Sequence, residues 1–353
     1  MVTKSKQREK ALETEFESNF PPFNSLHFEN NMSNPQFILH WYPNSPFAQK
    51  VAWALQYKNV DFKLVMISPI EPRPLRRPLD AGYRKTPVLQ IGNHTYCDSK
   101  VIFAELEKRF PEPSFYPLDA QGNSTEYSIL SLARWTENSV FQAIVTQIPM
   151  GKLGEAFIKD RSQFSGRKID PESLKFAAPY MLQGLNAELL AVEELVKSRH
   201  QNGSLWAFGT KELSLADLHI AMNVWFLGQF VGSKWLKSKI PVLSEHLTKT
   251  LAAVRFNDLE KLSQIDEEEA LVIAKEQSWK LQQATHDGSL KAKLGQVVAV
   301  IPTDSGMVPA LGTLVHSTIH ETVIENQQDN YGFTSYTHFP VIGFVVLPQA
   351  PKL

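Results

Sequence analysis

The stretch from Tyr83 to Lys100 constrains the fold most, because it combines a proline-led strand, a turn and a helix start. Thr86-Pro87 introduces a short apolar run, Gly92-Asn93 makes a turn, and Asp98-Ser99 opens a helical pattern after a second short run. Proline cannot donate to a sheet ladder, so it fits the first residue of its strand. The sequence therefore predicts a β-hairpin followed by a helix.

A hairpin of this kind offers several groups to one ligand. If the Thr86-Pro87 bond is cis, the main chain of Thr86 and Val88 faces outward and is able to pair with an extended peptide as an added strand. The sequence leaves the isomer open. Asp98-Ser99 then supplies a carboxylate, a hydroxyl and free backbone donors at the helix start. The alternative interpretation is that Pro87 only begins a strand and that Asp98 or Ser99 only caps a helix.

The residues before the hairpin predict a strand, a helix and a second strand. Phe37–Tyr42 is dense in aromatic and branched residues, as buried strands are. Apolar residues recur at helical spacing from Phe47 to Leu55, with Ser45 at the N-cap and Pro46 at the first helical position. Phe62–Ile67 completes a βαβ unit of a parallel sheet. With the hairpin and its helix, the order becomes the thioredoxin-like βαβ(α)ββα layout.

The segment from Ser68 to Tyr83 is rich in proline and arginine and has room for only a short irregular helix. Its basic residues, Arg73, Arg76 and Arg77, have two interpretations. A solvated basic loop is the commoner meaning of such a cluster, and contact with the carboxylate of a ligand is the other.

The second half of the chain changes character twice. Prolines break the chain between about residues 111 and 123, and helical periodicity begins near Thr125. Ser214-Leu-Ala-Asp217 is a capping box in which aspartate replaces the usual glutamate. After Asp287-Gly288 the sequence predicts three or four strands in a small antiparallel appendage. His316, His320 and His338 in this part are interpreted as surface or packing residues, and no metal is expected.

Composition excludes several classes of function. A net charge of −1 argues against nucleic acid or an anionic membrane surface as a bulk partner. Cys97 is the only cysteine, so neither an intramolecular disulfide nor a thiolate metal cluster is possible. No segment resembles a signal peptide or approaches the roughly 20 apolar residues of a membrane span. We therefore expect a soluble, cytoplasmic protein.

The hairpin and helix resemble the glutathione site of the glutathione transferase family, in which a proline-led strand pairs with the cysteinyl part of glutathione. The segment Tyr-Arg-Lys-Thr-Pro-Val-Leu-Gln-Ile-Gly, followed by Tyr-Cys-Asp-Ser, is most similar to fungal-type transferases with an extra C-terminal domain. The opening at Ser214 resembles that of the family's helical second domain. The resemblance covers about residues 35–285 and implies a multidomain α+β protein. Its expected parts are a polar N-terminal extension (1–34), a thioredoxin-like glutathione-binding domain (35–117), an all-helical domain (124–286) and a small β-rich appended domain (290–353).

The resemblance also implies roles for individual residues. Serine-type classes use a Ser-Pro-Phe step to stabilise the thiolate, which makes Ser45 the expected catalytic residue, with Asn44 and Tyr42 as fallback donors. Asp98 and Ser99 correspond to the pair that holds the γ-glutamyl end. Lys85 is the first candidate for the glycyl carboxylate, with Arg77 as the other. The expected glutathione-binding residues are Lys85, Thr86, Pro87, Val88, Asp98 and Ser99, and the expected lining of the electrophile pocket is Tyr42, Trp135, Phe141 and Gln142.

The expected function is an enzyme of detoxification or secondary metabolism that activates glutathione as a co-substrate and conjugates it to a small hydrophobic electrophile. Two alternatives share the same fold: an isomerase or cyclase that uses the glutathione site in making a natural product, and a non-catalytic glutathione-binding regulatory protein. The resemblance also implies a homodimer.

Overall fold

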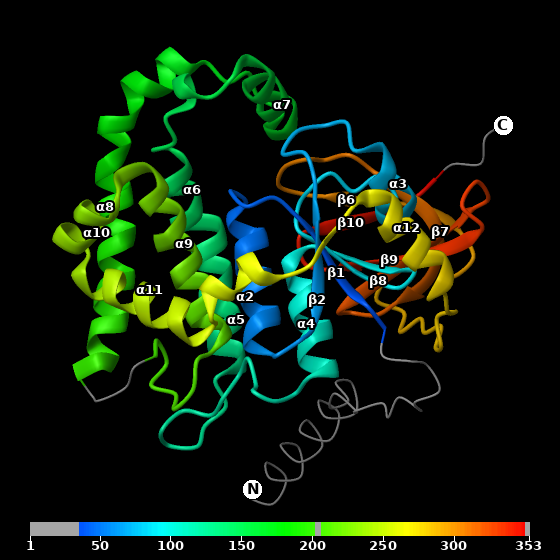
Figure 1. The fold of residues 1–353 in the computed structure, drawn as a ribbon, viewed down its shortest axis with the longest axis horizontal. Helices are drawn as coiled ribbons and strands as arrows, with labels where there is room; N and C mark the ends of the chain where they lie inside the picture. The colour runs from blue at the N-terminus through cyan, green and yellow to red at the C-terminus, as the bar shows by residue number, and fades with distance from the viewer. Residues whose placement is uncertain (1–34, 202–205, 350–353) are drawn as a thin grey trace, which may run out of the picture. The chain divides into compact units, whose positions relative to one another are not determined.

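A computed structural model of the chain describes residues 35–201 and 206–349 (Figure 1). The predicted polar extension, residues 1–34, lies outside the described residues. One sheet of ten strands runs through the described part, in the order β10-β6-β7-β8-β9-β4-β3-β1-β2-β5. The strands are β1 (Phe37–Trp41), β2 (Phe62–Met66), β3 (Val88–Ile91), β4 (His94–Cys97), β5 (Gln264–Ile265), β6 (Val297–Pro302), β7 (Ala310–Ser317), β8 (Glu321–Gln328), β9 (Phe333–Pro340) and β10 (Phe344–Pro348).

The first strands and helices form the predicted thioredoxin-like layout. Strand β1 pairs with β2 in parallel and with β3 in antiparallel orientation, and β3 pairs with β4 as a hairpin. The helices of this part are α2 (Pro46–Tyr57), the 3-10 helix η1 (Pro74–Arg76), α3 (Arg77–Asp80) and α4 (Ser99–Arg109). The short η1 and α3 are the irregular helix expected in the arginine-rich segment.

Both faces of the central sheet are covered, which explains why β1 lacks a polar face. Leu39 and Trp41 point to the face that packs against α2 and α4. Ile38 points to the other face, as alternate residues of a strand do, and packs against α12 (Glu267–Glu276). The Gln90 amide of β3 donates to the Ala270 carbonyl of α12 at 2.8 Å, so a polar bond reinforces the apolar contact.

The middle of the chain is helical, as predicted. Figure 1 shows α2 between the strands and the helices α9 and α11. Asp217 accepts from the backbone N–H of Ser214 at 2.8 Å, and the predicted capping box at the start of α9 is confirmed. The elements are α5 (Glu126–Trp135), a π-helix η2 (Thr136–Val140), α6 (Phe141–Val145), η3 (Met150–Lys152), α7 (Glu155–Ser165), α8 (Pro171–Gln201), α9 (Leu215–Val231), α10 (Ser233–Lys239), α11 (Pro241–Ala253) and η4 (Phe256–Lys261).

The C-terminal strands continue the thioredoxin-like sheet. Strand β9 pairs with β4 in parallel orientation, placing Tyr96 opposite His338, and β6 to β10 then follow as antiparallel neighbours. The predicted fold class is confirmed, including the antiparallel strands near the C-terminus. The predicted domain boundaries stay predictions, and the pairing with β4 means that the C-terminal strands share one sheet with the thioredoxin-like strands β1 to β4.

The histidine of β9 has ring partners in the same sheet. His338 Nε2 lies 2.9 Å from His94 Nδ1, and His338 Nδ1 lies 2.8 Å from the Glu321 carboxylate. His316 on β7 lies 3.2 Å from the Gln283 carbonyl oxygen. Within residues 35–201 and 206–349, no group of three or more His, Cys, Asp or Glu side chains is arranged to hold a metal. No helix in the same ranges is long and apolar enough to cross a membrane.

Candidate functional site

Strand register brings the predicted site residues to one end of the sheet. Val88 is opposite Cys97 on β4 and opposite His40 on β1. Val88 and Cys97 are the last paired residues of β3 and β4. Pro87 immediately precedes Val88, and Asp98 immediately follows Cys97, so both extend past the same end of the hairpin. The chain leaving β1 towards Ser45 departs from this same end. Ser45, Thr86 to Val88, and Asp98 with Ser99 therefore border one region of the molecule.

Ser45 is the N-cap of α2. Its backbone is extended, with φ −80° and ψ 112°, and Pro46 is the first helical residue. The Ala48 N–H donates to Ser45 Oγ at 3.4 Å, and no acceptor for the hydroxyl hydrogen of Ser45 exists among the described residues. The hydroxyl is therefore available to donate to a ligand atom placed at the helix start.

The two fallback donors lie differently. Tyr42 packs with Ile38 and Val65 on the sheet face covered by α12, which is opposite to the face covered by α2. Asn44 is exposed in the turn before Ser45. Ser45 is thus the hydroxyl whose position fits the predicted role best, and its catalytic role stays a prediction.

Asp98 and Ser99 form the start of α4. Asp98 caps the helix by accepting from the Lys100 N–H at 2.9 Å. Its backbone has a φ of 93°, and a non-glycine residue with positive φ is uncommon and often belongs to a ligand-binding site. Ser99 is the first helical residue and is 3% exposed. Asp98 and Ser99 therefore form the tight turn between the end of β4 and the start of α4.

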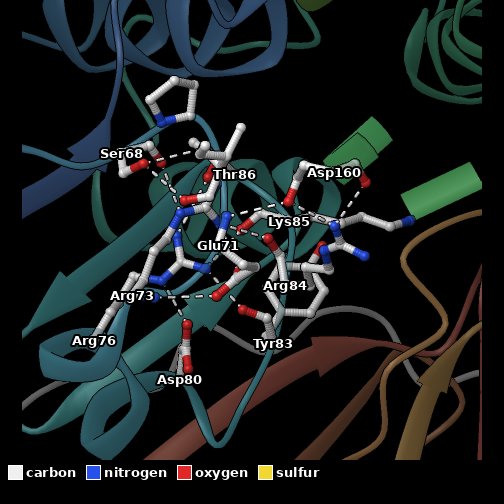
Figure 2. A network of polar contacts seen from close by, with 12 residues as sticks. Ser68, Glu71, Arg73, Arg76, Asp80, Tyr83, Arg84, Lys85, Thr86 and Asp160 are labelled. Atoms are coloured by element: carbon white, nitrogen blue, oxygen red, sulfur yellow. Dashed lines mark hydrogen bonds and ion pairs between the residues drawn. The ribbon is translucent and has the colours of Figure 1, made fainter. Parts of the chain in front are cut away.

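The Thr86-Pro87 peptide bond is cis, which resolves the isomer that the sequence left open. Thr86 is held by a buried arginine: Arg76 donates to Thr86 Oγ1 at 3.2 Å and to the Lys85 carbonyl at 3.1 Å (Figure 2). The same guanidinium pairs with Asp80 at 2.5 Å, and both side chains are 0% exposed. Arg76 therefore supports the chain that enters β3.

The other arginines of the segment are also engaged. Arg73 donates to the Ser68 carbonyl at 2.8 Å and to the Arg84 carbonyl at 2.7 Å. Arg77 pairs with Glu71 at 2.5 Å and donates to the Tyr83 carbonyl at 2.9 Å. The expectation of a solvated basic loop is wrong for these residues, because each guanidinium has acceptors within the fold. Arg77, the second candidate for a glycyl carboxylate, already has two carboxylate partners, Glu71 and Asp80.

Helix α7 forms hydrogen bonds with the same arginine-rich segment. Arg84 donates to the Asp160 carboxylate of α7 at 2.8 Å (Figure 2), and the Glu71 N–H donates to the same carboxylate oxygen at 3.1 Å. Lys85 is oriented differently and forms an ion pair with Asp304 in the loop between β6 and β7. Lys85, the first candidate for the glycyl carboxylate, thus has a partner from the C-terminal strands.

A buried charge network lies beneath the site and was missed by sequence reasoning. Lys50 of α2 is 0% exposed and donates to Glu137 of η2 at 2.7 Å and to His219 of α9 at 3.1 Å. Lys100 joins the network, lying 3.4 Å from Glu137 and 3.3 Å from Asp98. The sequence gives one sign of this role, which is that Lys50 is the only charged residue in α2.

Charge and burial compete within this network. Burial alone would raise the pKa of the Glu137 carboxyl, but the neighbouring Lys50 and Lys100 outweigh it and hold the pKa well below its usual range. Burial, together with the nearby Lys50, lowers the pKa of His219 well below its usual value, so the imidazole is neutral and accepts from Lys50. The result is an ionised carboxylate between two lysines, linking α2 and α4 to the helical part.

An aromatic row begins beside Ser45. The rings of Phe47 and Phe141 meet edge to face with centroids 4.9 Å apart, and Phe141 stacks on Phe226 at 5.6 Å. Gln142 is exposed on the helix that carries Phe141. Trp135, by contrast, donates from its indole N–H to Glu188 of α8 at 2.8 Å. Of the predicted pocket residues, Phe141 contacts the Ser45 segment through Phe47, and the Tyr42 carbonyl accepts from the Ser45 N–H at 3.0 Å. The pocket itself stays a prediction.

Comparison with known proteins agrees with this geometry. Residues 39–114 match the family model of the glutathione S-transferase N-terminal domain. A solved structure of a GST-like protein from Pseudomonas syringae superposes with a TM-score of 0.64 and 27% identity, covering 90% of this chain and 100% of that one. Residues 39–114 therefore form a glutathione S-transferase N-terminal domain, and the chain as a whole is similar to a GST-like protein. The narrower likeness to fungal-type members stays a prediction.

Two curated relatives match only a short part of the chain. Probable glutathione S-transferases of Solanum tuberosum and Nicotiana tabacum are 32% and 28% identical, over 21% and 25% of this chain. The alignments span 35% and 39% of these relatives, well under half of their length. Residues 139–259 match the family model of a domain of unknown function (DUF7962). This match assigns no activity to the helical part.

Proposed function

We propose that this protein is a glutathione transferase that binds glutathione at the end of the sheet and transfers its thiolate to a small hydrophobic electrophile. The observation that supports it best is the convergence of Ser45, Thr86 to Val88, and Asp98 with Ser99 at one end of the sheet, within the segment that matches the family model. Glutathione is then a co-substrate, and no metal is needed.

The chemistry requires a thiolate that the protein itself does not supply. Cys97 is fully buried, and burial raises the pKa of its thiol well above the usual value, so it is not a nucleophile. The thiol of free glutathione, with a pKa of about 8.5, is only a few per cent ionised at neutral pH. The reaction therefore depends on a site that stabilises the anion of a bound thiol.

Ser45 is placed to provide that stabilisation. Lowering a thiol pKa by about two units requires roughly 2.7 kcal/mol of preference for the anion. A hydrogen bond to a charged group contributes about 1.5–3 kcal/mol, and a helix N-terminus adds about 0.3–1 kcal/mol. The Ser45 hydroxyl stands at the N-terminus of α2, where both contributions act on one atom. The electrophile would lie against Phe47 and Phe141 beside it.

Two measurements test the proposed function. Retention on a glutathione-affinity column tests the site, and turnover of chlorodinitrobenzene with glutathione tests the chemistry. Retention with turnover supports the transferase. Retention without turnover would favour an isomerase, a cyclase or a regulatory protein that keeps the site, and failure to bind glutathione at all would refute the site.

Asp98→Ala and Ser99→Ala are each expected to weaken glutathione binding at least tenfold. The physical reason is that a charged end of the ligand loses a charge-assisted hydrogen bond. The loss of a helix cap costs only about 1 kcal/mol, which changes the melting temperature by a few degrees. Isothermal titration and thermal melting measure the two effects.

Asp266→Ala is a matched control for these variants. Asp266 also caps a helix, accepting from the Glu269 N–H at 2.7 Å, but it does so at α12. This variant should lose similar stability and keep its affinity for glutathione. Equal affinity in wild type, Asp98→Ala and Ser99→Ala would remove both residues from the site.

A homodimer is also proposed, because the helical part exposes large aromatic side chains. Tyr127 on α5 and Phe176 and Tyr180 on α8 are 78%, 72% and 71% exposed, and exposed apolar groups of this size often mark interfaces. Light scattering at micromolar concentration is expected to give twice the chain mass of 39.9 kDa. Phe176→Ser with Tyr180→Ser should shift the protein to the single-chain mass, and a wild-type mass of 39.9 kDa would contradict the dimer.

A further inference from the structure

The loop between β6 and β7, residues 303–309, lies against the chain that enters β3. Asp304 of this loop pairs with Lys85. The Gly306 N–H donates to the Phe164 carbonyl of α7 at 2.7 Å. A Cβ at Gly306 would come within 2.7 Å of the Phe164 ring and 3.6 Å of Lys85 Cγ, so the loop is closely packed at this point. The C-terminal strands therefore contribute a carboxylate next to the candidate site.

Lys85 differs from the buried arginines of this segment in its partner. Arg73, Arg76 and Arg84 all donate to backbone carbonyls of the fold. Within the described part of the chain, the Lys85 ammonium has a single partner, Asp304, whose side chain is 64% exposed. Lys85 immediately precedes Thr86 and Pro87, which border the proposed glutathione site. The Lys85 side chain is 14% exposed, so an anionic ligand group there would reach its ammonium in competition with the exposed Asp304.

Asp304 and such a ligand group would compete for the same ammonium. Both are carboxylates, and although a lysine ammonium has three donors it carries one positive charge, so a second carboxylate gains less from it once Asp304 is paired. Burial alone would raise the pKa of Asp304, but the neighbouring Lys85 outweighs it and holds the pKa below the usual value. The side chain is therefore ionised at neutral pH and occupies Lys85 when the ligand arrives.

We propose that Asp304 sets the charge selectivity of the glutathione site. By neutralising Lys85, it weakens the binding of glutathione through its ionised glycyl carboxylate. It leaves unchanged the binding of glutathione derivatives in which that carboxylate is an ester or an amide. The site is thereby suited to γ-glutamylcysteinyl ligands with an uncharged C-terminal end. This inference rests on the proposed function, and it assigns to the β6–β7 loop a residue that determines specificity.

The experiment compares glutathione with its glycyl monoethyl ester by isothermal titration. Wild type is expected to bind the two with similar affinity. Asp304→Asn frees Lys85 and should tighten binding of glutathione by about three- to fivefold, with no change for the ester. Adding Lys85→Met to Asp304→Asn should abolish the gain. Because Asp304 is exposed, the single variant should fold, and Asp304→Ser gives a second test of the same effect.

Asp258→Asn is the matched control, since Asp258 forms an exposed ion pair with Lys261 at 2.7 Å on η4. It should leave both affinities unchanged. Unchanged glutathione affinity in Asp304→Asn, or an equal gain for the ester, would overturn the role of Asp304 and leave the proposed function standing. If neither ligand binds to wild type or to any variant, the proposed glutathione site is wrong and this inference falls with it.

Discussion

Replacing Glu137 by alanine is expected to lower the free energy of unfolding by about 3–5 kcal/mol, because it leaves a buried lysine without its counter-charge. Lys50 is 0% exposed, and Glu137 lies 2.7 Å from its ammonium with 8% exposure. His219, the other partner of Lys50, is neutral and offers only a dipole. Urea unfolding at neutral pH, followed by circular dichroism, measures the change.

Two variants distinguish this effect from the loss of any carboxylate. Glu172→Ala breaks a pair with Lys175 in which both side chains are about 80% exposed, and it should cost less than about 0.5 kcal/mol. Lys50→Met combined with Glu137→Leu should recover most of the stability, since no unpaired charge remains. Similar losses in Glu137→Ala and Glu172→Ala would show that the buried pair contributes little.

The effect of Glu137 should also depend on pH. Its folded pKa lies below the usual value, so the stabilisation is fully present above the ordinary glutamate pKa of about 4.3 and declines as pH falls through the folded pKa. The difference in unfolding free energy between wild type and Glu137→Ala should be constant near neutral pH and shrink below about pH 4.

The parts of the candidate site that could be predicted are those in which residue type acts locally. A serine before a proline at the start of a helical pattern predicts an N-cap, and Ser45 is one. Pro87 stands directly before β3, and Asp98 caps α4, as the hairpin pattern indicated. The βαβ order then determines that these three points share one end of the sheet.

The charge network could not be predicted, because its members come from four separate helical segments, α2, α4, η2 and α9. Lys50, Glu137 and His219 meet only after α2, η2 and α9 have packed, and each is surrounded in sequence by residues of ordinary helices. Glu137 also lies in a π-helix, which adds a residue to the turn and changes the direction in which the side chain points. Simple helical periodicity would place it differently.

The pairing of β4 with β9, which joins the N-terminal and C-terminal strands, also could not be predicted from the sequence. Strand β4 has the same local pattern whether it is an edge strand or has a neighbour, and its neighbour β9 lies more than 200 residues away along the chain. An edge strand needs protection from unwanted pairing, and here β9 supplies it.

The burial of the arginine-rich segment could not be predicted either. Composition alone does not show that Arg76 and Asp80 are both buried in an ion pair.

Ser45→Ala is expected to reduce glutathione-dependent activity near neutral pH by about ten- to a hundredfold. Without the hydroxyl, the thiolate of bound glutathione loses a hydrogen bond, and its pKa should rise towards the free value by about one to two units. Affinity for glutathione should change little, because the contacts expected from Asp98, Ser99 and the chain around Thr86 remain. Activity should recover partly as pH rises, since more of the thiol then ionises without help.

The deciding measurement is a titration of thiolate absorbance in the glutathione complex of wild type and Ser45→Ala. Ser45→Thr is the matched control, because it keeps a hydroxyl at the N-cap and should keep most of the lowered pKa. Thermal melting shows whether Ser45→Ala also destabilises the fold. The hydrogen bond from the Ala48 N–H to the Ser45 hydroxyl is long at 3.4 Å, so its loss should cost no more than about 1 kcal/mol of stability. Identical titration curves in wild type and Ser45→Ala would show that Ser45 only caps α2. The thiolate would then have to be stabilised by Asn44 or by the free backbone N–H groups at the helix start.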